Sequence, residues 1–505
     1  MITKKSPLLV LSQIINSLFG YIGLFFIIRF IGLQYWGFLS FSLAFIGLMS
    51  IVGDLGYGSA HLRFLSDKNT DKGVCNGTFL TIRTVQTFIT VFFVLIALFV
   101  WIDVLHRGFQ SNVEIYTIIL LLPYVFFRKL KDVPNIYFNS KLQSARMSLP
   151  QMIEAIVRNS AFIYLGILYF YKIPGYNIIN ASILLAIIYS ISYFLYFIIA
   201  YAIGRPWNIK KPTLEMFRKY TKIAYPLALA SIIGSVSGNI DKVLIEFYWH
   251  AVATGAFASL QKITSPIVTF SGTISVLFIP LLMNGHTKKE FTDNIASFER
   301  IISLFILPLV VIFIGLRIYV ANLWDSSLIP YSDLLIFLAL SSYFIAINSP
   351  YSSSLIARGL TKKIGLLTVI SLVINIILDL LLIPSSIFGV TYFSLGVLGG
   401  AVSTFISMLF ETLAYRLIVI KSEQMPVNLK ILMQLIPSGA QFLFLFFITM
   451  YIKVYDIVLF APVAVSSIII FFIVAILLKE ISLKQLITFI KLLNPFSIKK
   501  AFKNE

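Results

Sequence analysis

Long apolar stretches separated by short polar connections run along nearly the whole chain. A stretch of about 18 or more apolar residues is long enough to cross a bilayer as an α-helix. The first stretch is too long for the apolar part of a cleaved signal peptide, which measures about 7–15 residues. The pattern predicts an all-α polytopic membrane protein with about fourteen spanning helices, at residues 7–31, 36–58, 77–102, 114–137, 149–171, 177–203, 221–247, 251–283, 299–321, 330–357, 364–387, 394–418, 429–452 and 455–478.

Composition agrees with this pattern. Of the 505 residues, 59% are hydrophobic and only 12% are charged. A soluble domain carries about 25% charged residues, so the polar residues here cannot cover a globule of this size. The single cysteine, Cys75, excludes an intramolecular disulfide and is typical of a reduced cytoplasmic face.

The net charge of +19 is explained by membrane topology. Of the 40 basic residues, 31 fall in connections on the same side as Lys4 and Lys5, and that side includes the cluster 128–131. The alternate connections hold only Arg107, Lys172 and Lys453. Basic residues concentrate on the cytoplasmic side of membrane proteins. We therefore expect a multi-pass protein of the cell membrane, with both termini cytoplasmic and no nucleic-acid partner.

The longest polar connection divides the chain. It predicts a first six-helix lobe at 1–204, a cytoplasmic connection at 205–220, and a second lobe at 221–421. Residues 422–478 supply two further helices, and 479–505 form a tail whose stretch 481–493 has the pattern of an interfacial helix on anionic lipid. Short similar segments around Gly37 and Gly255 suggest that the lobes are parallel repeats with a central cavity between them.

Catalysis is not expected. The sequence has no glycine-rich phosphate loop ending in Gly-Lys-Ser/Thr, and its four histidines are too dispersed for a metal site. The external connections are too short to fold over a sugar donor. No cofactor is predicted beyond a coupling ion.

Charged residues inside the predicted spans point to an anionic cargo. An ionisable group at bilayer depth is costly and normally faces a protein interior or a wet cavity. Guanidinium groups bind phosphate oxygens through paired donors. The residues that could line such a cationic cavity fall in five spans of both lobes, and are Arg29, Arg83, Arg158, Lys242 and Lys262.

Two of these cations have a simpler interpretation. Arg29 lies close enough to a span end to reach the interface. Glu154 and Arg158 are four residues apart and could neutralise each other. Asp54 is a further intramembrane acid.

A cation site is predicted in the second lobe. Asn375 and Asp379 are four residues apart on one helix face, and the glycine-rich run 396–404 ends at Thr404. Together with Asp241 they could hold a dehydrated Na⁺. The alternative is that Asn375 and Asp379 only join helices to one another.

Four segments carry a resemblance to a known family. The chain resembles the polysaccharide-biosynthesis branch (polysaccharide transporters and O-antigen-type flippases) of the multidrug/oligosaccharidyl-lipid/polysaccharide exporter superfamily. The likeness extends over spans 1 to 12. The segments that carry it are 29–37 (RFIGLQYWG), 53–58 (GDLGYG) with Arg63, Tyr225-Pro226 with 239–242 (NIDK), and 396–404 after Asp379, Ile383 and Pro384.

This resemblance implies a V-shaped exporter fold and a flippase. Such proteins carry polyprenyl-diphosphate-linked oligosaccharide from the cytoplasmic to the outer leaflet by alternating access of two six-helix lobes. The related lipid II flippases have basic cavity residues that Arg29, Arg83 and Lys242 match. Their sodium site is matched by Asp241, Asn375, Asp379 and Thr404. Na⁺ or H⁺ coupling is therefore an expectation.

Two other functions stay open at this point. One is a cation-coupled multidrug antiporter on the same fold. The drug exporters of the superfamily that the chain resembles often keep a carboxylate in the first span, and residues 7–31 hold none, which disfavours this function. A membrane glycan polymerase or transferase is disfavoured by the short external connections. We expect a monomer that acts beside glycan-assembly enzymes and serves the assembly of polysaccharide or glycoprotein glycans.

Overall fold

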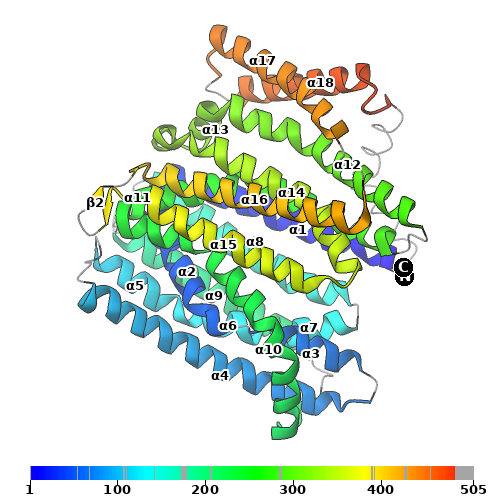
Figure 1. The fold of residues 1–505 in the computed structure, drawn as a ribbon. Helices are drawn as coiled ribbons and strands as arrows, with labels where there is room; N and C mark the ends of the chain where they lie inside the picture. The colour runs from blue at the N-terminus through cyan, green and yellow to red at the C-terminus, as the bar shows by residue number, and fades with distance from the viewer. Residues whose placement is uncertain are drawn as a thin grey trace. The chain divides into compact units, whose positions relative to one another are not determined.

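The computed structural model describes residues 2–483, apart from 54, 68, 106–108, 110, 142, 172–178, 205–207, 284–286, 388–389, 392, 426–428 and 455–456. The predicted acidic residue Asp54 and nearly all of the predicted interfacial tail helix therefore lie outside the described residues. Figure 1 shows the chain as a set of helices with one small pair of strands, β1 (Ser386–Ile387) and β2 (Val390–Thr391).

The expectation of an all-α membrane protein is confirmed. Within the described residues, ten helices are long and apolar enough to cross a membrane, and two shorter apolar helices cover Ile15–Ile31 and Leu33–Met49. Many side chains on the outside of these helices are large and apolar, such as Phe88, Phe92 and Leu443. Such residues are stable where the solvent is lipid. The number fourteen stays a prediction.

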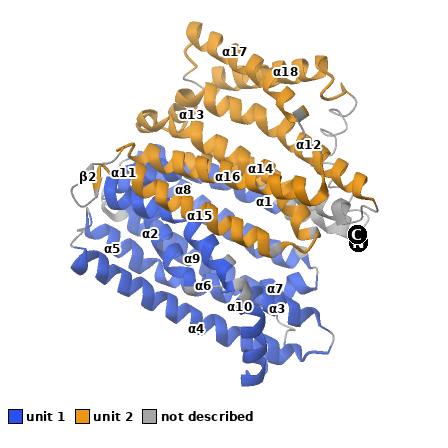
Figure 2. Ribbon diagram, viewed as in Figure 1, with its two compact units in different colours: residues 1–258 blue, residues 259–505 orange. Residues whose placement is uncertain are grey.

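The chain divides into two compact units, residues 1–258 and 259–505 (Figure 2). This boundary lies later than the predicted lobe boundary at 205–220. Two elements after the connection belong to the first unit. The helix α10 (Leu214–Ser237) buries Met216 and Tyr220 against the core residues Phe79 and Phe138, and residues 240–258 follow it there.

The first unit is a helical bundle in which α1 packs along α8, and α8 along α9. Its core is built from aliphatic and aromatic side chains such as Phe41, Phe45 and Trp101. Its elements before α10 are α1 (Ile2–Phe26), η1 (Ile27–Ile31), α2 (Leu33–Met49), η2 (Ser50–Gly53), α3 (Tyr57–Ser66), α4 (Lys72–Phe99), η3 (Val100–Val104), α5 (Asn112–Leu120), α6 (Leu122–Leu130), α7 (Asp132–Ser140), α8 (Ser144–Phe170) and α9 (Ile179–Ile203).

The span predicted at 114–137 is three short helices, α5, α6 and α7, rather than one. Pro123 and Pro134 lie in the first turns of α6 and α7, where a missing N–H costs least. The helices adjoin at Leu121 and Lys131, where φ and ψ stay in the right-handed helical region and backbone hydrogen bonds continue from one helix to the next. As a result, the basic residues 128–131 lie within a helical segment of the bundle and not in a connection.

The predicted seventh span, 221–247, is divided between two helices: residues 221–237 lie in α10, and residues 240–247 begin the long helix α11 (Ile240–Met283). The predicted eighth span, 251–283, forms the remainder of α11. The helix is kinked at His250, whose backbone has φ 67° and ψ −178°. This is a left-handed conformation that costs a non-glycine residue of order 1–3 kcal/mol and is held only by its surroundings. The kink falls between the end of the predicted seventh span at 247 and the start of the predicted eighth span at 251. The sequence therefore predicted an interruption at this position.

The second unit contains the remainder of α11 and a second set of helices, in which α14 and α15 both pack against α16. The helix pair α17–α18 packs against α12. These elements are α12 (Lys288–Gly315), α13 (Arg317–Trp324), η4 (Ser326–Tyr331), α14 (Leu334–Ala357), α15 (Thr361–Leu382), α16 (Val397–Glu423), η5 (Leu429–Gln434), α17 (Leu435–Tyr451) and α18 (Ile457–Leu477).

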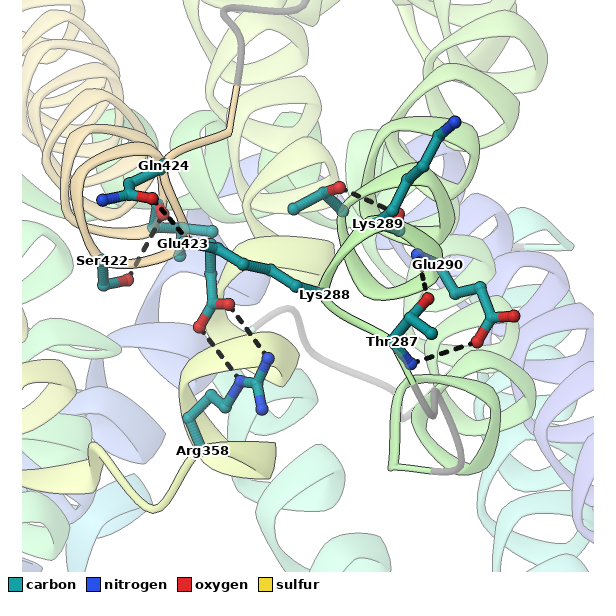
Figure 3. A network of polar contacts seen from close by, with 10 residues as sticks. Thr287, Lys288, Lys289, Glu290, Arg358, Ser422, Glu423 and Gln424 are labelled. Carbon is teal, nitrogen blue, oxygen red and sulfur yellow. Dashed lines mark hydrogen bonds and ion pairs between the residues drawn. The ribbon is translucent and has the colours of Figure 1, made fainter.

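Polar contacts fasten helix ends in the second unit (Figure 3). Arg358, after α14, donates from Nε and Nη2 to the two carboxylate oxygens of Glu423 on α16, at 3.0 and 2.9 Å. Lys288 Nζ, at the start of α12, donates to Gln424 Oε1 at 2.9 Å. Such paired contacts are directional, so they fix three helix ends relative to one another.

Candidate anion-binding cavity

A cavity of about 570 Å³ lies within the first unit. Ligand cavities in proteins are commonly about 300–1,000 Å³, so the space is large enough for a polar head group. Its walls come from α2, η2, α4, α6, α7 and α10, together with Lys131 and Asn239. The neutral part of the lining includes Ser50, Ser231, Ser235 and Asn239, whose side chains can hydrogen-bond hydroxyl groups.

The charged part of the lining is strongly basic. Four cations and one carboxylate border the cavity among the described residues, and they are Arg83, Arg128, Lys129, Lys131 and Asp132. Several basic groups around one space of low dielectric produce a field that concentrates anions.

Arg83 is held firmly on α4. Its side chain is only 4% exposed. Its Nη1 donates to the Gly53 carbonyl at 3.1 Å and to Gln86 Oε1 at 3.2 Å. The guanidinium carbon lies 4.9 Å from the centre of the Phe79 ring, which is a cation–π distance. Its Nη2 lies 3.2 Å from Asp132 Oδ2. These partners hold the buried guanidinium in one orientation at the cavity wall.

The cations on α6 and beside it are oriented by tyrosines. Arg128 Nη1 donates to Tyr124 Oη at 2.9 Å, and Lys131 Nζ lies 4.7 Å from the centre of the Tyr196 ring. Lys129 is 8% exposed. A Cβ atom placed on Gly53 would lie 1.6 Å from Lys129 Nζ, so the missing side chain of Gly53 makes room for the ammonium group.

Of the five predicted cavity cations, Arg83 lines this cavity and the other four do not. Arg29 is exposed in η1 beside Phe25, at 5.6 Å from the ring centre. Arg158 is bound to Glu154 at 2.6 Å, which matches the neutralising pair of the alternative interpretation. Lys242 is half-buried on α11 and donates to the Gly238 carbonyl at 3.4 Å, and Lys262 belongs to the second unit and is exposed.

Sequence reasoning missed Arg128, Lys129 and Lys131 as cavity residues. Their basic character assigned them to a cytoplasmic connection. The signal that could have found them is their position inside the predicted span 114–137, where three cations are costly unless they face water or protein.

Two residues of the predicted cation site, Asn375 and Asp379, are connected through α16 in the second unit, as both the cation site and the helix-joining alternative require. Asn375 Nδ2 donates to Ser403 Oγ at 3.3 Å, and Ser403 Oγ in turn donates to Asp379 Oδ1. Ser403, which the sequence analysis did not name, thus connects the two predicted residues. Thr404 Oγ1 donates to the Gly400 carbonyl of its own helix at 2.9 Å. Asp241 belongs to the first unit, where it is 6% exposed.

These arrangements suit binding rather than bond-breaking chemistry. Within the described ranges, no group of three or more His, Cys, Asp or Glu side chains could hold a metal ion. The oxygens of Asn375, Asp379 and Ser403 are the ligand type that Na⁺ prefers.

Known proteins resemble this chain both in sequence and in fold. A probable low-salt glycan biosynthesis flippase of Haloferax volcanii, Agl15, is 19% identical over 420 residues, covering 82% of each chain. Among solved structures, the lipid II flippase MurJ in an inward closed conformation superimposes with a TM-score of 0.70 and 18% identity, covering 93% of this chain and 99% of that one.

An inward-facing multidrug transporter of the MATE family matches less closely, with a TM-score of 0.57 and 16% identity over 81% of this chain and 95% of that one. At these identities the two structures establish the exporter fold and nothing about cargo. A family model described as "Polysaccharide biosynthesis protein" matches residues 2–286, more than half of the chain. The resemblance seen in the motifs is therefore confirmed, and the chain belongs to the polysaccharide biosynthesis protein family.

Proposed function

We propose that the chain is a flippase that carries polyprenyl-diphosphate-linked oligosaccharide from the cytoplasmic to the outer leaflet of the cell membrane. The observation that carries the proposal is the set of four cations, Arg83, Arg128, Lys129 and Lys131, around a 570 Å³ cavity inside an exporter fold. The names of the flippases that resemble the chain support lipid-linked glycan as the class of cargo.

The chemistry of the lining suits this cargo. The diphosphate of a lipid-linked glycan carries concentrated negative charge, which guanidinium and ammonium groups bind with charge-assisted hydrogen bonds. Serine and asparagine side chains can contact sugar hydroxyls. The polyprenyl chain can stay in the bilayer throughout, because apolar carbon has no reason to leave lipid. A cationic drug would be repelled by the same lining, which disfavours a multidrug antiporter.

The protein acts in this proposal as a transporter and forms or breaks no covalent bond. Movement of the cargo follows from alternating access of the two halves of the chain. A cation bound by Asn375, Asp379 and Ser403 couples that movement to an ion gradient. Both termini are cytoplasmic, and the protein works as a monomer.

Glycan export in a strain whose own copy of the gene is deleted tests the proposal. Arg83→Ala and Arg128→Ala should each abolish the surface glycan while the protein stays in the membrane at normal abundance. Lys219→Ala is the matched control, because Lys219 is an exposed cation on α10 that lies 2.7 Å from Glu215 and does not line the cavity. Normal export by both arginine variants would reject the assignment of the cavity.

A further inference from the structure

Asp132 is the one acidic side chain among the described residues that line the cavity. Its Oδ2 lies 3.2 Å from Arg83 Nη2, and its Oδ1 lies 3.6 Å from Lys131 Nζ. Both oxygens of the carboxylate therefore occupy positions on the cations that an incoming phosphate group would need. A carboxylate and a phosphate present the same kind of acceptor to a guanidinium, so the two compete directly.

Arg83 has partners other than Asp132. The Gly53 carbonyl, Gln86 and the Phe79 ring hold the guanidinium through neutral contacts. The Arg83 side chain is only 4% exposed, whereas that of Asp132 is 32% exposed. The cation is thus a fixed part of the wall, and the carboxylate is the partner with room to move.

Asp132 also remains stabilised after it leaves Arg83. It is the first residue of the nine-residue helix α7, and its Oδ1 lies 3.6 Å from Lys131 Nζ, so a second cation is at hand. Rotation of its side chain away from Arg83 leaves the negative charge beside Lys131.

Resting on the proposed function, we infer that Asp132 is an internal counter-ion that occupies the anion seat of Arg83 in the empty transporter and is displaced when a diphosphate binds. In the empty state Asp132 supplies a negative partner to the buried Arg83 guanidinium. It also lowers the affinity for cargo, because the diphosphate must replace an existing ion pair. After release of the cargo, Asp132 forms its ion pair with Arg83 again.

Binding of inorganic pyrophosphate to purified full-length protein in detergent, followed by calorimetric titration, tests the inference. Asp132→Asn should bind pyrophosphate about tenfold more tightly than the wild type, since a like charge next to the seat is removed. Asp132→Glu is the matched control that retains the charge, and its affinity should stay near that of the wild type. Arg83→Ala should bind at least about tenfold more weakly, because a charge-assisted contact is lost.

Tighter binding by Asp132→Asn should be accompanied by slower export of glycan, since release becomes harder. If Asp132 only maintained the shape of the cavity, its substitution would lower both the pyrophosphate affinity and the rate of glycan export. Equal or weaker pyrophosphate binding by Asp132→Asn, with a wild type that binds and an Arg83→Ala variant that does not, would overturn the counter-ion role alone. A wild type that does not bind, or that binds no better than Arg83→Ala, would overturn the cavity assignment itself and the inference with it.

Asp132→Ser serves as a second variant in case Asp132→Asn does not fold. If neither variant gives a monodisperse protein with a cooperative thermal transition, Asp132 is required by the fold and is not a displaceable group. That result also overturns the inference.

Discussion

His61 is an imidazole enclosed by aromatic side chains in the first unit. It is fully buried on α3, its Nδ1 lies 2.6 Å from Tyr220 Oη, and its ring stacks on Phe79 with centroids 4.0 Å apart. Phe79 in turn contacts Arg83 of the cavity. Burial, reinforced by the positive charge of Arg83, lowers the pKa of His61 to about 3. The ring is therefore neutral in the folded protein at physiological pH.

A pH dependence of stability follows from this lowered pKa. The unfolded chain takes up a proton near pH 6.5 and the folded one does not, so stability is complete above that pH and falls as the pH drops below it. At pH 5 the loss should be about 2 kcal/mol. Thermal unfolding in detergent at pH 7.5 and pH 5 should show a larger drop for the wild type than for His61→Gln. An equal fall in thermal stability for both proteins would contradict the lowered pKa of His61.

Glu299 is a buried acid that sequence analysis passed over. It is fully buried on α12, where it accepts a hydrogen bond from Arg416 Nη2 of α16, and Arg416 Nε donates to Tyr351 Oη at 3.1 Å. Removing one partner of a buried ion pair leaves an uncompensated charge.

Glu299→Gln should therefore destabilise the second unit by about 3–5 kcal/mol. The measurement is the unfolding midpoint in detergent. Glu215→Gln, which changes an exposed partner of Lys219, is the matched control and should leave the midpoint unchanged. A normal midpoint for Glu299→Gln would show that Arg416 finds compensation elsewhere.

At the scale of elements, two glycines determine how α2 meets α11. A Cβ atom on Gly37 would lie 1.9 Å from the Ala251 carbonyl oxygen, and one on Gly255 would lie 2.2 Å from the Leu33 carbonyl oxygen. The backbones of the two helices touch at both places. The sequence singled out Gly37 and Gly255 as marks of an internal repeat, and the structure shows that both are needed for close packing within the first unit.

Gly37→Ala should force α2 and α11 apart, because its neighbour is rigid backbone rather than the end of a flexible side chain. Overpacking of this kind costs about 1–3 kcal/mol. Gly365→Ala on α15 is the matched control, since a Cβ there meets open space, and it should be neutral or slightly stabilising. Thermal unfolding of the two variants distinguishes the cases. Equal effects would mean that the helix contact is loose.

The sequence predicted the elements better than their inward faces. Apolar length is enough to locate a span, because the bilayer imposes it, and a non-helical interval was placed correctly around His250. Which cation faces a cavity depends on helix rotation and on helix junctions such as Leu121 and Lys131. Runs of apolar residues do not encode these features. Arg83 could be found because it is isolated in an apolar stretch, whereas the cluster 128–131 looked like a connection.

At the scale of the whole molecule, the distribution of basic residues predicts the orientation in the membrane. The chain offers a clean test, because its single cysteine, Cys75, is fully buried and can be removed. In a Cys75→Ala background, Lys453→Cys should react with an impermeant maleimide in intact cells. Lys289→Cys should react only after the cells are permeabilised. Both lysines are exposed in the structure. The opposite pattern would invert the topology and the proposed direction of transport.

The central claim is that the cations of the first unit carry a diphosphate-linked glycan across the membrane. The most direct measurement is the movement of a fluorescent polyprenyl-diphosphate oligosaccharide between leaflets of vesicles that contain only the purified protein. The wild type and Lys219→Ala should move the lipid at the same rate, and the double variant Arg83→Ala/Arg128→Ala should not move it above the rate of empty vesicles. Movement by the double variant at the wild-type rate would contradict the account.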